Sequence, residues 1–236
     1  MQRRTLIGAP LISGIAAALS PLPPALAHAD VPRPLAANLV TATPTRWNGH
    51  DCLAAELTDA EQALRLAVGQ GGGNRPSIAV VAPAFADGVI EAWVGGELTG
   101  RGAPDDRGFV GLSFHIGDGF QSHETVYLRM TNGRLNVPPP PAPRIDRAIQ
   151  YVADPGFHFS HSRAAFPGRY EKGADIALGR WHRLRLEIRG ARLAALVDGV
   201  EALAVDDLRF AGRPAPVGLF VGDGSRGYFR DVVILS

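Results

Sequence analysis

The sequence predicts an all-β protein built as a β-sandwich, on three observations. Short runs of alternating apolar and polar residues recur from Trp47 onward. Turn signals such as Asp87-Gly88, Asn132-Gly133 and Asp198-Gly199 separate these runs. Long helical patterns are nearly absent. Many short strands with turns between them favour two packed antiparallel sheets over helical or mixed architectures.

The N-terminal residues carry the features of an export signal. Arg3 and Arg4 precede a mostly apolar stretch from Leu6 to Leu19, and Ala27-His28-Ala29 fits a small-x-small cleavage site. We expect residues 1–29 to be a signal peptide, of either the general secretory or the twin-arginine type. Prolines interrupt the apolar stretch, so no stable membrane span is expected. The mature protein is then expected in the periplasm or outside the cell.

Charge and cysteine content narrow the classes of function. The full chain has 24 basic and 23 acidic residues, and removal of residues 1–29 leaves 22 against 23. A nearly neutral chain has no basic surface for nucleic acid and no basic amphipathic helix for membranes. Cys52 is the only cysteine, so no internal disulfide forms, and we interpret it as a buried apolar residue. We expect a monomer.

The first elements after the signal are an extended lead-in and an ambiguous segment. Residues 30–45 hold three prolines and little pattern, so we place the sandwich domain at 46–236. Thr58-Asp-Ala-Glu61 matches a helix capping box, but Ala63 to Val68 fits a strand equally well. Because strands surround this segment, we favour a hairpin.

Three strands predicted between Gly88 and Gly133 have two chemically different faces. In the middle strand, Val110, Leu112, Phe114 and Ile116 alternate with Phe109, Gly111, Ser113 and His115. The flanking runs place Ile90, Ala92, Val94 and Val126, Leu128, Met130 on the apolar face, opposite Glu91, Trp93 and Tyr127, Arg129. We expect neighbouring strands whose polar side chains gather on one working face, with the apolar set forming a core.

The remaining elements complete the sandwich around an irregular middle. Val137-Pro-Pro-Pro-Pro-Ala-Pro143 is expected to be extended and outside any sheet interior. Residues 150–171 are rich in aromatics, His and Arg, and either line a site or form a packed loop over an open edge. Trp181 to Arg189 alternates as a strand with one wet face. Asp198-Gly199 fits a hairpin turn, and 217–221 and 228–235 are the final strands.

Several short segments resemble one superfamily. They are Asp87-Gly-Val-Ile-Glu-Ala-Trp93, Arg107-Gly-Phe-Val-Gly-Leu-Ser-Phe114, Glu124-Thr-Val-Tyr-Leu-Arg129, Gln150-Tyr151, Pro167-Gly-Arg-Tyr-Glu171 and Gly179-Arg-Trp181. From Trp47 onward the chain resembles the concanavalin A-like lectin/glucanase superfamily, within it bacterial exported proteins related to laminin-G-like and keto-glycoside hydrolase-like domains. The resemblance implies a concanavalin A-like jelly-roll sandwich of two antiparallel sheets that commonly binds carbohydrate on its concave sheet. The Glu-x-Asp-x-x-Glu strand of related glucanases has no counterpart around Glu91 or Glu124.

These residues give a candidate site for carbohydrate. We assign Glu91 and His115 as acid–base candidates and Arg129 and Gln150 as partners for polar groups. Trp93, Tyr127 and Tyr151 are candidates for stacking on a sugar ring, and His158 and Tyr170 for further contacts. Hydrolysis needs a second carboxyl group, for which Asp154 and Glu171 are candidates. The alternative is a structural polar layer in which Glu91 pairs with Arg129.

No cofactor is expected. His158-x-x-His161 lacks a third metal ligand nearby. Calcium remains open, because Asp118, Asp198 and Asp223 lie in turns, although each also has an explanation as a turn residue beside glycine. The leading hypothesis is an exported protein that binds a glycan and can cleave a glycosidic bond. The alternatives are a non-catalytic recognition or adhesion domain and a structural envelope protein.

Overall fold

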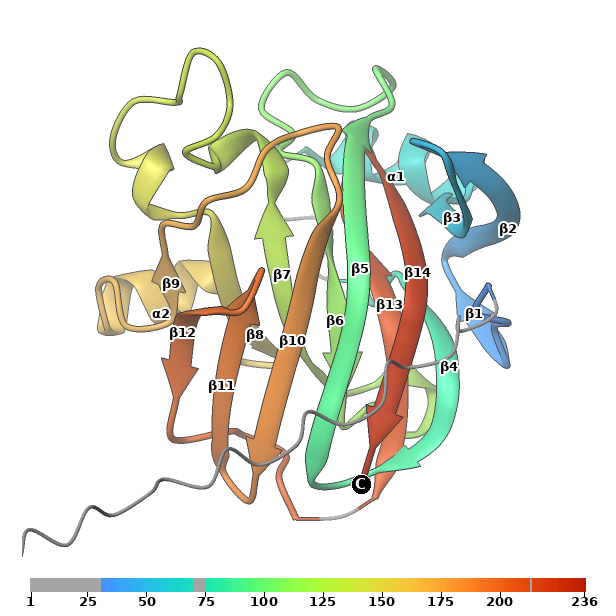
Figure 1. The fold of residues 1–236 in the computed structure, drawn as a ribbon, viewed down its shortest axis with the longest axis vertical. Coiled ribbons are helices and arrows are strands. Elements are labelled where there is room, and N and C mark those ends of the chain that lie inside the picture. The colour runs from blue at the N-terminus through green and yellow to red at the C-terminus, as the bar shows by residue number, and fades with distance from the viewer. Residues whose placement is uncertain (1–30, 70–74, 213) are drawn as a thin grey trace, which may run out of the picture.

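The computed structural model describes residues 31–69, 75–212 and 214–236, and it confirms an all-β sandwich of two antiparallel sheets. Sheet A has the strand order β1-β4-β13-β6-β7-β8-β9, and sheet B the order β12-β11-β10-β5-β14-β3-β2. Figure 1 shows sheet B in front of sheet A. The expected signal peptide, 1–29, lies outside the described residues.

The elements have the following bounds in chain order. The strands are β1 Ala36–Asn38, β2 Val40–Trp47, β3 His50–Leu57, β4 Ile78–Phe85, β5 Gly88–Leu98, β6 Phe109–Phe114, β7 His123–Arg129, β8 Ile149–Asp154, β9 Glu171–Lys172, β10 His182–Arg189, β11 Arg192–Val197, β12 Val200–Val205, β13 Ala215–Val221 and β14 Ser225–Leu235. The helices are α1 Asp59–Val68 and α2 Phe159–Ala165, with 3₁₀ turns at Asp118–Phe120, Met130–Asn132 and Arg144–Asp146. Among the described residues no helix is long and apolar enough to cross a membrane.

The core fills the space between the sheets, and strand alternation explains which residues enter it. Leu112 and Val126 of sheet A and Leu184 and Leu186 of sheet B are fully buried, while Arg185 points outward. Each such aliphatic side chain contributes about 1.5–3 kcal/mol of transfer free energy. Cys52 is buried and free, as predicted.

The structure differs from the sequence predictions in two segments near the N-terminus of the sandwich. Residues 36–47, expected in part as a lead-in, form β1 and β2, which pair with β4 and β3. The predicted hairpin at 58–68 is wrong, because this segment is the helix α1. The Thr58 side chain accepts a hydrogen bond from the Glu61 backbone N–H, as a helix N-cap does.

The strands predicted as neighbours between Gly88 and Gly133 belong to different sheets. β6 pairs with β7 in sheet A, as predicted, whereas β5 lies between β10 and β14 in sheet B. The apolar face of each strand enters the shared core from opposite sides. The polar faces of β5 and β6 therefore point away from one another, and the prediction that they form one working face is wrong.

The alternation of the middle strand is interrupted at His115, which has a left-handed φ of +50°. This backbone conformation places its imidazole against Glu124 on the core side of the sheet. Ile116 instead joins Ile78 and Val80 in a small apolar cluster on the outer face of sheet A. The predictions that His115 is on the working face and Ile116 in the main core are therefore wrong.

Candidate functional site

The outer face of sheet A carries a pocket of about 200 Å³, which we call the outer-face pocket. Its floor is formed by β6, β7, β8 and β13, one wall by α1 with the segment before β6, and the other by the segment leading into α2. Its lining includes Arg65, Arg75, Asp105, Asp106, Phe109, His123, Tyr127, Asp154, His158, Phe159, Phe220 and Asp223.

Three aromatic rings form the floor. Tyr127 has its ring centroid 5.8 Å from that of Phe109 and 5.5 Å from that of Phe220. Gly111 leaves the space for this arrangement, because a Cβ there would lie 2.7 Å from the Tyr127 Cβ. Aromatic surface with a polar hydroxyl at its edge suits the apolar face of a sugar ring.

An ion-pair network holds the α1 wall. Arg65 is 5% exposed and donates to Glu61 at 2.8 Å, to Asp223 at 2.5 Å and to the backbone oxygen of Arg75 at 2.8 Å. The Arg75 guanidinium also donates to Glu61, at 2.7 Å. These contacts hold Asp223 at the pocket and give the buried Arg65 guanidinium carboxylate and carbonyl partners.

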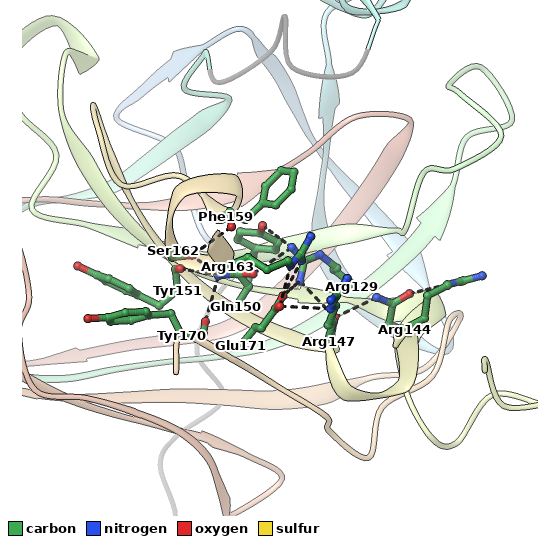
Figure 2. A network of polar contacts seen from close by, with 12 residues as sticks. Arg129, Arg144, Arg147, Gln150, Tyr151, Phe159, Ser162, Arg163, Tyr170 and Glu171 are labelled. Carbon is green, nitrogen blue, oxygen red and sulfur yellow. Dashed lines mark hydrogen bonds and ion pairs between the residues drawn. The ribbon is translucent and has the colours of Figure 1, made fainter. Parts of the chain in front are cut away.

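A second network holds α2, and Figure 2 shows its members converging on Glu171. Arg163 of α2 donates to both Glu171 oxygens, at 2.8 and 2.6 Å. Arg129 of β7 lies 3.4 Å from Glu171 and donates to Tyr127 and Gln150, each at 3.1 Å. The network ties α2 to the sheet and fixes the hydroxyl of Tyr127 beside the pocket.

His123 and Asp154 face one another across β7 and β8. The His123 Nε2 atom lies 3.9 Å from Asp154 Oδ2, which is too long for a direct hydrogen bond. Their side chains are 5% and 14% exposed. Among the described residues, the buried His123 Nδ1 and the buried Oδ2 of Asp106 have no hydrogen-bond partner. Both atoms belong to residues that line the pocket, but the atoms themselves are buried, and Asp106 Oδ2 packs against Gly102 and Gly224.

Burial shifts the pKa values of four pocket groups in the direction that favours the neutral form of each group. It raises the pKa of Asp154 to about 6. Burial, with the nearby charge of Asp223, raises the pKa of Asp106 to about 6. Burial lowers the pKa of His123 to about 4, and burial together with Arg129 lowers that of His158 to about 4. His123 and Asp154 are therefore not an ion pair at neutral pH.

The predicted site residues divide between the pocket and other places. Tyr127 and His158 line the pocket. Arg129 and Gln150 lie on the same face of sheet A but are buried in the Glu171 network, at 5% and 1% exposure. These two residues therefore support the site without lining the pocket.

Glu91 and Trp93 lie on the outer face of sheet B, on the far side of the sandwich from the pocket. Glu91 pairs with Arg185 at 3.2 Å, so the alternative of a Glu91–Arg129 pair is also wrong. The guanidinium of Arg230 lies 4.7 Å from the centre of the Trp93 ring. An acid–base pair of Glu91 and His115 is contradicted, because the two residues belong to opposite sheets.

Tyr151 and Tyr170 face the interior and not a ligand. Tyr151 is fully buried and donates its hydroxyl to Glu124, which also bonds His115. Tyr170 is 1% exposed and donates to Asp207 at 2.7 Å. Burial raises the pKa of Tyr151 first of all, with the Glu124 charge adding to it. The aromatic residues of 150–171 thus serve mainly the core.

The sequence interpretation missed His123, Asp106 and Arg65. His123 could have been found, because it shares the strand parity of Tyr127 within β7. Asp106 and Arg65 carry no comparable signal, since α1 and the segment before β6 meet the sheet only in three dimensions. In the described ranges, no three His, Cys, Asp or Glu side chains are grouped to hold a metal ion.

No protein-family model matches the sequence, and no curated protein matches it. Solved structures that match include the carbohydrate binding module CBM66 from Bacillus subtilis, at 13% identity and TM-score 0.49 over 83% of this chain and 94% of that one. A protein of unknown function with a galectin-like fold, also from Bacillus subtilis, matches at 12% identity and TM-score 0.46 over 82% and 86%. A β-1,3-1,4-glucanase from a mouse hindgut metagenome matches at 13% identity and TM-score 0.40 over 66% and 69%.

Proposed function

We propose that this chain is an exported protein that binds a glycan in the outer-face pocket of sheet A. The observation that supports it is the combination of an aromatic floor with the polar side chains of His123 and Asp154, which line the same pocket without a direct hydrogen bond between them. Small-molecule sites typically combine apolar walls with a few convergent polar groups. Sugars match both, through their C–H faces and their hydroxyl edges.

The test is a glycan-binding screen of the mature chain followed by calorimetry on the best ligand. Phe159→Ala removes an aromatic side chain from the wall, and we expect affinity to fall about 2- to 13-fold, as loss of ~0.5–1.5 kcal/mol would give. Phe166→Ala is the matched control, because Phe166 is 38% exposed and packs on Tyr170 away from the pocket lining. Binding that responds equally to both substitutions, or no binding at all, would reject this site.

A second candidate function is cleavage of a glycosidic bond, favoured by two carboxyl groups with raised pKa values in one pocket. Asp106 and Asp154, each with a pKa of about 6, can hold a proton in mildly acidic solution, as a general acid must. The test is product detection by mass spectrometry with the ligand that the screen finds. Binding without product, at pH 5 and at pH 7, would leave a recognition domain.

A further inference from the structure

The ionisable side chains that line the outer-face pocket carry a net negative charge when all carboxyl groups are ionised. Four aspartates line it, Asp105, Asp106, Asp154 and Asp223. Two arginines, Arg65 and Arg75, oppose them. His123 and His158 are neutral at pH 7, because burial lowers their pKa values to about 4. A ligand in the pocket is therefore surrounded by a net negative charge at pH 7.

The arginines near the pocket already have carboxylate partners. Arg65 binds Glu61 and Asp223, and Arg75 binds Glu61. On the opposite wall, Arg129 and Arg163 both bind Glu171. To bind a carboxylate or sulfate of a ligand, Arg65, Arg129 or Arg163 would have to give up one of these pairs, which costs free energy when the partner left behind is buried. Arg75 is 47% exposed, and its pair with the buried Glu61 neutralises part of its charge.

The pocket disfavours ionised carboxyl groups mainly because it buries them. Burial raises the pKa of Asp154 to about 6, and burial, followed by the charge of Asp223, raises the pKa of Asp106 to about 6. The groups around Asp154 are Tyr127 and His123 of β7 and His158 ahead of α2, with Asp106, Asp223, Arg65 and Arg75 across the pocket. A further anion would meet the same penalty.

The gap between His123 and Asp154 fits one hydroxyl group. Their Nε2 and Oδ2 atoms are 3.9 Å apart, so an oxygen placed beside both can lie at hydrogen-bond distance from each. The hydroxyl would donate to the Asp154 carboxylate and accept from His123 Nε2–H, which matches one donor and one acceptor.

We propose that the outer-face pocket selects a neutral sugar, one hydroxyl of which bridges His123 and Asp154, and that it excludes sugars bearing a carboxylate or sulfate. This inference rests on the proposed glycan binding and specifies its ligand class. The volume of about 200 Å³ is below the ~300–1,000 Å³ usual for drug-sized ligands, so the pocket takes about one sugar ring.

The test compares matched sugars with and without a charge. The probes are the methyl glycosides of glucose, galactose and mannose, their uronate counterparts and their 6-sulfates, titrated into the mature chain by calorimetry at pH 7 and pH 5. At pH 7 we expect the charged member of a binding pair to bind at least about tenfold more weakly, from like-charge repulsion. At pH 5 the difference should shrink, because Asp106 and Asp154 become mainly protonated.

Two variants locate the effect. Asp154→Asn should reduce the ratio of neutral-sugar affinity to charged-sugar affinity at pH 7 and make this ratio less dependent on pH. His123→Gln should lower the affinity for the neutral sugar about fivefold, as loss of one hydrogen bond of ~1 kcal/mol would. Asp51→Asn is the charge-matched control, because Asp51 is an exposed residue of β3 in sheet B. The neutral-to-charged affinity ratio of this variant should equal that of the wild type. Thermal unfolding establishes that each variant is folded.

The outcomes separate the two proposals. A charged sugar that binds as tightly as its neutral counterpart at pH 7 overturns the selectivity and leaves glycan binding standing. The same holds if folded Asp154→Asn keeps the ratio of the wild type. If no sugar binds the folded wild type, the proposed function itself is overturned.

Discussion

Replacement of Glu171 by Gln tests whether one buried carboxylate organises the α2 wall. Glu171 is 6% exposed at its side chain and faces Arg163 at 2.6 Å, Arg147 at 3.3 Å and Arg129 at 3.4 Å. Removing one partner of a buried ion pair costs about 3–5 kcal/mol. Arg147 and Arg163 are 33% and 29% exposed, so water can solvate them in the variant. We therefore expect a loss near ~3 kcal/mol, or roughly 6–12 °C in Tm for a chain of this size.

Urea denaturation at pH 7, followed by tryptophan fluorescence, measures this loss. Burial alone would raise the pKa of Glu171, but the Arg163 guanidinium, with Arg129 and Arg147, holds it below its ordinary 4.5. A carboxyl group whose pKa is lower in the folded state stabilises the fold at any pH above its pKa in the unfolded state. This contribution disappears as the pH falls through its pKa in the folded state. The stabilities of the wild type and variant should therefore converge below about pH 4.5.

The control for this prediction is Glu187→Gln. Glu187 pairs with Arg185 at 2.7 Å but is 45% exposed, so its removal should cost less than about 1 kcal/mol. If Glu171→Gln costs no more than Glu187→Gln, or if the difference from the wild type persists unchanged at pH 3, the reasoning about the network is refuted.

Three further predictions follow from the fold and the pocket. Thr58→Ala removes the N-cap of α1 and should cost about 1 kcal/mol in urea denaturation; no change would mean that the cap is dispensable. Gly111→Ala places a Cβ 2.6 Å from the Tyr127 Cα and should cost about 1–3 kcal/mol or more, a prediction that an unshifted Tm would contradict. Between pH 4 and 6, the raised pKa of Asp154 makes the folded state less stable as the pH rises. The lowered pKa of His123 makes the folded state more stable over the same range, so the two effects oppose one another. Asp154→Asn should therefore make Tm rise more steeply with pH than in the wild type, and His123→Gln should do the reverse; equal slopes in a pH series of Tm would count against both shifts.

The alternation of side chains predicted much of the fold. The strand predicted from Trp181 to Arg189, with one wet face, has Leu184 and Leu186 in the core and Arg185 outside. Alternation does not reveal which of two sheets a strand joins. β5 and β6 are consecutive, and their apolar faces look alike, yet they belong to opposite sheets. Glu91 was therefore assigned to the wrong side of the molecule.

Local backbone conformation accounts for another part of what the sequence left open. His115 adopts a left-handed φ that a period of two cannot anticipate, and this turns its imidazole to Glu124. At Thr58 the capping box favours a helix and the surrounding strands favour a hairpin, and the structure has the helix, with Thr58 as its N-cap. His123 lay within reach of the same alternation argument that identified Tyr127.

The position of β14 bears on how the chain reaches its native state. This strand occupies the middle of sheet B, hydrogen-bonded to β5 on one side and β3 on the other. Its Arg226 contacts Glu56, 170 positions earlier. Until the ribosome has released β14, β2 and β3 have no attachment to the rest of their sheet. The two halves of sheet B can therefore join only after β14 has formed, and pairing between segments so far apart in the sequence is slow.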